Sequence, residues 1–324
     1  MARARAVVVA AALGAALGSA GLLPAQAGEP ATRVLGGPGF VPVAVNAHRV
    51  VLGRVEPTGE AQVVTRDGGL RTLRDPAGTT GSSVAGLDDS GTVTGGATGA
   101  DGAPRVVQWR SPDYQPELLD LSPGAWYVAD VDRGGRVLLR RGDDRSYVWR
   151  AGSLAAVADL TSGALQRATL LDPAGDLVDA LATPPVLWTG GRAVALEAPA
   201  GLAVAVSDVE DGAVYGTVSD YAAGGIPARA VRWDASGRLH RLPLPAGTGG
   251  PAYASVTGTA GAHDRAAGTV CRTATGACLA LTWRRDRLTV VGPGTARAVD
   301  GKGGVVGTAP VDGGVRGVLW KRHA

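Results

Sequence analysis

The stretch Ala298-Val-Asp-Gly-Lys-Gly-Gly-Val-Val-Gly307, separated by ten residues from Val318-Leu-Trp320, carries the marks of a unit that recurs along this chain. An aspartate opens a glycine-rich turn, valines and a glycine follow, and a second apolar run ends in tryptophan. A short Asx side chain bonds to its own backbone and permits a sharp chain reversal. The stretch therefore predicts short strands joined by tight turns.

Tryptophan gives the period of the unit. Six tryptophans recur at intervals of 40, 39, 45, 50 and 37 residues, namely Trp109, Trp149, Trp188, Trp233, Trp283 and Trp320. Each follows a short apolar run, and most are followed by a polar turn and another apolar run. This order predicts a hairpin around each tryptophan. In the first unit, Thr65 stands where the others carry tryptophan.

The Asx residue and a closing glycine form a second repeated signature, seven residues apart. The full pattern occurs as Asn46 with Gly53, Asp88 with Gly95, and Asp300 with Gly307. Variants have Asp132 with Leu139, Asp172 with Asp179, and Asp208 with Gly216 one residue further away. We interpret each Asx as the residue that caps the turn between the first two strands of a unit.

These signatures predict an all-β, seven-bladed β-propeller with four-stranded blades. The last unit ends without a fourth strand, and the segment from Thr32 to Leu35 precedes the first Asx turn without a partner in its own unit. We expect this N-terminal strand to complete the C-terminal blade and so close the ring. A β-solenoid would have a shorter repeat, and a pair of sandwiches would have no common period.

The unit, as written for residues 298–320, resembles the HAF extracellular repeat of exported bacterial proteins. The resemblance extends loosely over nearly the whole chain after its first thirty residues. It implies extracellular, propeller-like repeats and no particular activity. The third and fourth units depart from it because they lack the closing glycine.

The N-terminus predicts export. Arg3 and Arg5 precede an apolar run from Ala6 to Leu23, and Ala25-Gln-Ala27 follows as a small-residue cleavage site. This is the order of a secretory signal peptide, so we expect residues 1–27 to be cleaved after Ala27 and residues 28–324 to form a single propeller domain. A membrane anchor needs a more strongly apolar segment. We expect a secreted monomer that does not insert into membranes.

Charge and cysteine content narrow the classes of partner. Without Arg3 and Arg5 the chain carries 30 basic and 29 acidic residues, scattered rather than clustered, so nucleic acid is not an expected partner. Cys271 and Cys278 flank a hairpin turn and predict a structural disulfide in an exported chain, with a metal or redox pair as the alternative. No spacing of acidic residues matches a calcium loop, and we expect no metal and no cofactor.

The motifs of hydrolases and nucleotide-binding proteins, such as GxSxG, HExxH and the Walker loop, are absent from the sequence. This favours a non-catalytic binding or scaffold module for an unknown protein or carbohydrate. The alternative is an extracellular hydrolase or lyase acting on carbohydrate through carboxylates in the channel. The candidate ligand-contacting residues are aromatic and lie at predicted blade junctions or in a long loop: Trp126, Tyr127, Tyr221 and Tyr253. They suit stacking on a ligand, or alternatively capping of the core between blades.

Overall fold

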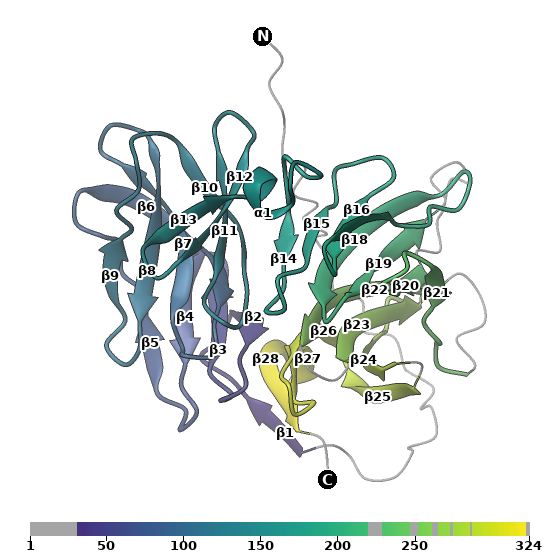
Figure 1. The fold of residues 1–324 in the computed structure, drawn as a ribbon. Coiled ribbons are helices and arrows are strands. Elements are labelled where there is room, and N and C mark those ends of the chain that lie inside the picture. The colour runs from purple at the N-terminus through teal and green to yellow at the C-terminus, as the bar shows by residue number, and fades with distance from the viewer. Residues whose placement is uncertain are drawn as a thin grey trace.

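The structure, a computed structural model, describes residues 31–219, 229–246, 252–260, 265–272, 275–285 and 287–321. These residues form seven antiparallel, four-stranded sheets arranged as the blades of a β-propeller (Figure 1). The predicted fold is thereby confirmed. In the described ranges, the single helix, α1 (Val157–Leu160), is too short to cross a membrane.

Each blade runs from an inner strand at the channel to an outer strand at the rim. Blade 1 comprises β2 (Phe40–Val45), β3 (Val51–Val55), β4 (Glu60–Val64) and β5 (Leu70–Thr72). Blade 2 comprises β6 (Thr79–Leu87), β7 (Val93–Gly99), β8 (Pro104–Arg110) and β9 (Gln115–Leu118). Blade 3 comprises β10 (Trp126–Val131), β11 (Val137–Arg141), β12 (Ser146–Arg150) and β13 (Ser153–Ala156). Blade 4 comprises β14 (Leu170–Leu171), β15 (Leu177–Asp179), β16 (Val186–Thr189) and β17 (Arg192–Ala195).

Blade 5 comprises β18 (Ala203–Glu210), β19 (Ala213–Ser219), β20 (Arg229–Trp233) and β21 (Leu239–Arg241). Blade 6 comprises β22 (Ala252–Ala260), β23 (Arg265–Arg272), β24 (Cys278–Arg284) and β25 (Arg287–Pro293). Blade 7 comprises β26 (Thr295–Val299), β27 (Val305–Val311), β28 (Gly314–Lys321) and β1 (Ala31–Val34).

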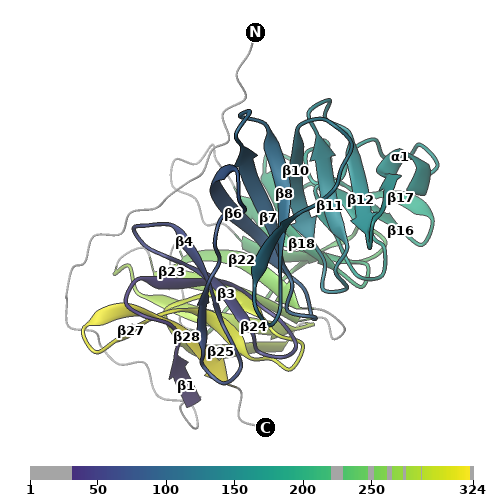
Figure 2. The same ribbon diagram turned by 90° about the vertical axis from the view of Figure 1, so that its left-hand side faces the viewer.

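The N-terminal strand closes the ring, as the sequence predicts. Strand β1 pairs antiparallel with β28, with Val34 opposite Val318. The amide of Leu35 continues the ladder by donating to the carbonyl of Gly317 at 2.8 Å. Figures 1 and 2 both show the purple β1 beside the yellow β28. The outer edge of β28 is therefore covered by the other end of the chain.

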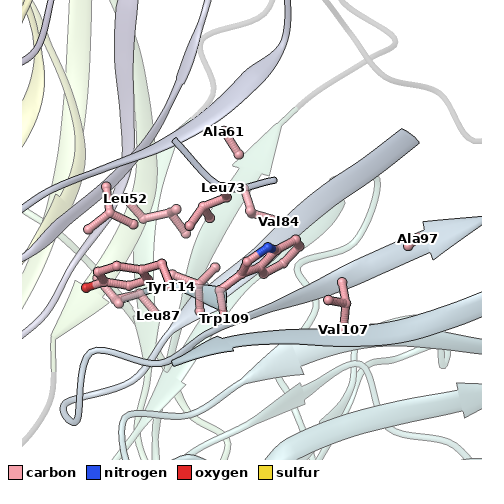
Figure 3. Close-up of a cluster of buried hydrophobic side chains, with 11 residues drawn as sticks. Leu52, Ala61, Leu73, Val84, Leu87, Ala97, Val107, Trp109 and Tyr114 are labelled. Carbon is pink, nitrogen blue, oxygen red and sulfur yellow. The ribbon is translucent and has the colours of Figure 1, made fainter. Parts of the chain in front are cut away.

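The repeated tryptophans lie on the third strand of six blades, where they pack between neighbouring sheets. Figure 3 shows the cluster between blades 1 and 2, in which Trp109 packs with Leu52, Leu87 and Tyr114. In blade 1 the register pairs Val51 with Val64, the position that holds tryptophan elsewhere. The sequence prediction of Thr65 for this position is therefore wrong by one residue.

Three of these tryptophans also tie one blade to the blade before it. The indole N–H of Trp109 donates to the carbonyl of Arg74 at 2.8 Å, and those of Trp233 and Trp283 reach Glu197 and Pro243 at 2.8 and 2.7 Å. Each acceptor lies just beyond the outer strand of the preceding blade. Each of these tryptophans therefore fills the core and satisfies its polar atom between blades.

The Asx residues cap the turns between the first and second strands. The side-chain Oδ1 of Asp300, for example, accepts from the amides of Lys302 and Gly304 at 2.8 and 2.7 Å. Equivalent bonds form at Asn46, Asp88, Asp132 and Asp172. We call the face of the ring that carries these turns the Asx face. The opposite face, where the second strand leads to the third and one blade leads to the next, is the loop face.

Blade 5 departs from the predicted turn. Its register pairs Val209 with Val214, so Glu210 occupies the place that Asn or Asp holds in the other turns. Asp208 lies two residues earlier, within β18. The prediction that Asp208 caps this turn is therefore wrong, and its side chain is placed on the channel wall instead.

Candidate functional site in the central channel

The inner strands of six blades carry a β-bulge at the same position. The extra residue lies between paired neighbours in β2, β6, β10, β18, β22 and β26, and is Val43, Ala85, Ala129, Ser207, Thr257 and Arg297 in turn. A bulge breaks the alternation of side chains and re-aims them. As a result, consecutive residues such as Ser207 and Asp208 both line the channel.

The closing glycines of the repeat lie opposite these bulges rather than in the turns. Gly95 and Gly307 pair with Val84 and Ala296, the residues that immediately precede the bulge. A Cβ atom at Gly307 would overlap the carbonyl oxygen of Thr295. The glycine is needed because the bulged strand approaches its backbone closely.

The channel contains a cavity of about 220 Å³. Its described wall is formed by the bulge residues of blades 1, 2, 5 and 7, the residues that follow the bulges in blades 1, 2, 3, 5 and 7, and parts of the Asx turns, which places the cavity toward the Asx face. The charged lining residues in the described part of the chain are Asp130, Asp132, Arg133, Asp208, Glu210 and Arg297. They come from blades 3, 5 and 7, and most of the remaining wall is small or apolar.

Asp130 is the most perturbed acid of the channel. Its two carboxylate oxygens accept from the amides of Val131 at 2.8 Å and Leu171 at 2.9 Å, the second of which belongs to blade 4. Burial among the blades, followed by the neighbouring charge of Asp208, raises the pKa of Asp130 to about 7. Desolvation and a second carboxylate both disfavour ionisation. Asp130 therefore changes its charge near neutral pH.

An ion pair spans the Asx-face end of the cavity. Arg133, in the turn of blade 3, donates to the carboxylate of Glu210, at the end of β18 in blade 5. The pair bypasses blade 4, whose inner strand β14 has only two residues. Arg136 contributes a second link, because it bonds to Asp132 in its own turn at 2.6 Å and to the carbonyl of Asp172 in blade 4.

Blade 4 also contains a buried pair of acids. Burial, together with the nearby charge of Asp176, raises the pKa of Asp172. One carboxylate oxygen of Asp172 accepts from the amides of Gly175 and Asp176, both at 2.9 Å. These bonds hold the turn of blade 4, and blade 4 lies between the two blades that the ion pair of Arg133 and Glu210 connects. Asp172 therefore has a structural role in the Asx face.

Trp126 lies in the core rather than on the surface. Its side chain is 3% exposed, packs edge-on against Tyr147 with ring centres 5.2 Å apart, and donates to the carbonyl of Ser122 at 2.8 Å. The guanidinium of Arg141 lies 5.7 Å from its ring centre. These contacts correspond to the alternative role that the sequence leaves open, capping of the core at a blade junction.

Tyr127 is 46% exposed and lies on the loop face beside several charged side chains. Its strand partner is Arg140, and Arg167 pairs with Asp144 at 3.3 Å in the adjoining loop. The two kinds of loop meet beside Tyr127, because the amide of Gly142 donates to the carbonyl of Ala125 at 3.1 Å. We call Tyr127, Arg140, Asp144 and Arg167 the Tyr127 patch.

The structure does not bring the four candidate aromatic residues together as one described surface. Tyr221 lies outside the described residues. Tyr253 lies on β22, where only the backbone is described, and it pairs with Cys271 of β23. A contribution of these two side chains to ligand binding stays a prediction.

The cysteine pair is confirmed as a disulfide. Cys271 and Cys278 are joined by a bond of 2.07 Å between facing positions of β23 and β24. No group of three or more possible metal-binding side chains occurs within the described ranges.

The channel residues are those that sequence reasoning missed. The repeat signatures assign no role to Asp130 and place Asp208 in a turn. One signal in the sequence could have indicated these residues. In each case an acidic residue comes immediately before a valine, within an inner strand whose other residues are mostly small or apolar. A bulge has no comparable signature, because the extra residue is alanine, serine, threonine, valine or arginine.

The comparisons with known proteins agree on the fold. No protein-family model and no curated protein sequence matches the chain. Among solved structures, a catalytically inactive virginiamycin B lyase from Staphylococcus aureus with quinupristin is similar, with a TM-score of 0.53 and 11% identity over 91% of this chain and 99% of that chain. A streptogramin B lyase gives a TM-score of 0.51 and 11% identity over 89% and 97%. At this identity, the likeness establishes a common propeller fold alone.

Proposed function

We propose that this protein is an exported, non-catalytic binding module that holds a macromolecular partner on its loop face, as a monomer. The observation that carries the proposal is the Tyr127 patch, where a half-exposed tyrosine is the strand partner of Arg140, and Arg140 and Arg167 both pair with Asp144. Tyrosine and arginine are enriched at protein interfaces and frequently dominate their binding energy. The composition of the patch therefore favours a protein partner over a carbohydrate.

Export is part of the proposal. The N-terminal order of basic, apolar and small residues, the HAF-like repeat and the disulfide all suit a secreted protein. Expression of the full chain in a secreting host should give a product in the medium that begins at Gly28, as measured by intact mass. A product that keeps residues 1–27 and stays with the cells would contradict secretion.

The partner-binding surface can be tested with two matched variants. Proteins and glycans captured by the immobilised chain would be identified, purified and measured individually against Tyr127→Ala. We expect a loss of at least about tenfold in affinity, which corresponds to one well-packed interface side chain. Val290→Ala, a truncation at a 46% exposed site on the outer strand β25, should bind as the parent does. Equal affinity of the Tyr127 variant would reject the patch.

A second candidate function is supported by the environment of Asp130. A carboxyl group that stays protonated near neutral pH beside a second carboxylate can act as a general acid. This is the arrangement that a hydrolase or lyase acting on carbohydrate would need. Turnover of a glycan by the parent protein, abolished by Asp208→Asn, would support an enzyme. Turnover that survives this change would indicate a contaminating activity.

A further inference from the structure

The cavity in the channel is separate from the Tyr127 patch on which the proposed function rests, although it contains Asp130 and Asp208 of the second candidate function. Its volume of about 220 Å³ lies below the range of roughly 300–1,000 Å³ typical of sites for drug-sized ligands. Ala85, Gly86 and Ala298 contribute small side chains to its wall. The size therefore suits a ligand no larger than an amino acid.

One side of the cavity is acidic. Asp130 and Asp208 occupy equivalent positions, one residue after the bulge, in blades 3 and 5. Both keep part of their surface open to the channel. Because the two carboxylates are close together, the charge of Asp208 is the second-largest cause, after burial, of the raised pKa of Asp130. A cation placed between them would relieve this repulsion.

Blade 7 contributes the opposite charge. Arg297 is the bulge residue of β26, is exposed, and lines the same cavity. It forms no salt bridge with any residue in the described ranges. Arg133, the other guanidinium of the wall, is already paired with Glu210. The planar guanidinium of Arg297 can bind an anionic group of a ligand, and its fork of N–H donors suits a carboxylate.

We propose that the channel cavity binds a small zwitterion of amino-acid size, with its ammonium group against Asp130 and Asp208 and its carboxylate on Arg297. The site differs from the Tyr127 patch in location and in ligand class, so it does not depend on the proposed function. The wall supplies charge at both ends of the cavity, and its small apolar residues cover the carbon chain between them.

The distance between the ammonium and carboxylate groups that the cavity prefers can be determined with a series of unbranched amino acids. Isothermal titration of the parent with glycine, β-alanine, 4-aminobutanoate and 6-aminohexanoate would compare ligands that differ only in chain length. The alkylamine and the carboxylate of matching length are the controls with one charge each. We expect one zwitterion to bind at least about tenfold more tightly than either control. Absence of binding across the whole series at millimolar concentration would overturn the proposal, as would an amine that binds as well as the zwitterion.

Two variants assign the two ends of the ligand. Arg297→Gln should lower the affinity for the zwitterion about tenfold or more and leave the weak affinity for the amine unchanged. Asp208→Asn should weaken both. Arg287→Gln, on the outer strand β25, should change neither. Zwitterion affinity that is unaffected by both channel substitutions would place the ligand elsewhere and overturn the assignment.

The pH dependence of binding gives a readout that does not require a variant. Among the described residues, the charged groups that line the cavity with Asp130 are Asp132 in the turn after β10, Asp208 on β18, the pair of Arg133 and Glu210, and Arg297 on β26. Guanidinium groups do not titrate in this range. An ammonium group favours ionised Asp130, so affinity should rise as the pH increases from about 6 to about 8, with proton release on binding. Affinity that falls over this range would contradict contact between the ammonium group and Asp130.

Discussion

At the scale of single residues, the buried tryptophans of the third strands combine packing with a specific hydrogen bond. Trp233 is fully buried and its indole N–H bonds to the carbonyl of Glu197 in the preceding blade. Trp188, at the same position of blade 4, is only partly buried. Equivalent positions in the sequence repeat therefore contribute differently to stability, because the preceding blade covers Trp233 more completely than it covers Trp188.

Truncation of these two tryptophans should have unequal effects. Trp233→Ala should lower the free energy of unfolding by about 3–5 kcal/mol, because it removes a large buried side chain and leaves a carbonyl without its donor. Trp188→Ala should cost clearly less. Chemical denaturation followed by circular dichroism would measure both. Equal losses would show that the two blade interfaces are packed alike.

The glycines opposite the bulges provide a second test. Gly307→Ala should destabilise the protein by more than about 1 kcal/mol, because the new methyl group would overlap the carbonyl of Thr295. Gly314→Ala is the matched control, since a Cβ there meets no atom within 4 Å. Differential scanning calorimetry would compare the melting temperatures of the two variants. A Gly307 variant as stable as the control would show that the bulge can shift to make room.

At the scale of elements, the strand β1 supplies the outer edge of blade 7 from the opposite end of the sequence. A chain that begins at Gly36 should melt at a lower temperature and aggregate, because the edge of β28 would be left open. A chain that begins at Ala31, and so keeps β1, is the control. Light scattering during thermal denaturation would separate them. Identical melting and solubility of the two chains would contradict closure by β1.

The elements also show how far the sequence could predict this fold. The spacing of tryptophans and Asx residues identified the blades, their four strands and the closing strand, because bulky cores and capped turns are local requirements. The bulges could not be predicted, since Ala129 and Ser207 occupy places that an ordinary strand would also accept. The error at Asp208 has a related origin, because a turn one residue shorter moved Glu210 into the capping position.

The candidate site was harder to predict than the fold. The disulfide of Cys271 and Cys278 could be predicted from the sequence, because it depends on facing positions of one hairpin, whereas a binding role for Tyr127 stays a prediction. The cavity combines Asp130, Asp208 and Arg297, which lie on three separate blades. These side chains come together only because the ring closes and because the bulges turn them toward the channel. A repeat signature predicts blades and turns, but it does not predict the direction of an individual side chain.

At the scale of the whole molecule, burial of acids should make stability depend on pH. The pKa of Asp130 rises from 3.8 to about 7 on folding, so the folded state binds this proton more tightly than the unfolded state. The resulting stabilisation is complete below about pH 4 and is lost as the pH rises through about 7. Asp172 shifts in the same direction. For Asp130, the upper bound of this contribution is about 4 kcal/mol.

This dependence can be measured with a variant that cannot ionise. The parent should be more stable at about pH 5 than at about pH 8, and Asp130→Asn should show a smaller difference between the two. Asp113→Asn, in an exposed turn, should behave as the parent does. Denaturant titrations at both pH values would provide these comparisons. A parent that gains stability as the pH rises over this interval would show that other groups dominate the ring.

Because of the bulges in the inner strands, the residues that line the channel are different from the residues that hold the blades together. In blades 1, 2, 5 and 7 the extra residue and the one after it line the cavity, whereas the tryptophans, the glycines opposite and the capped turns hold the blades. Substitutions at Val43, Ala85 or Arg297 can therefore accumulate with little penalty to folding. Natural homologues should accordingly diverge most at these lumenal positions, so that a common ring could acquire new small-molecule preferences one blade at a time.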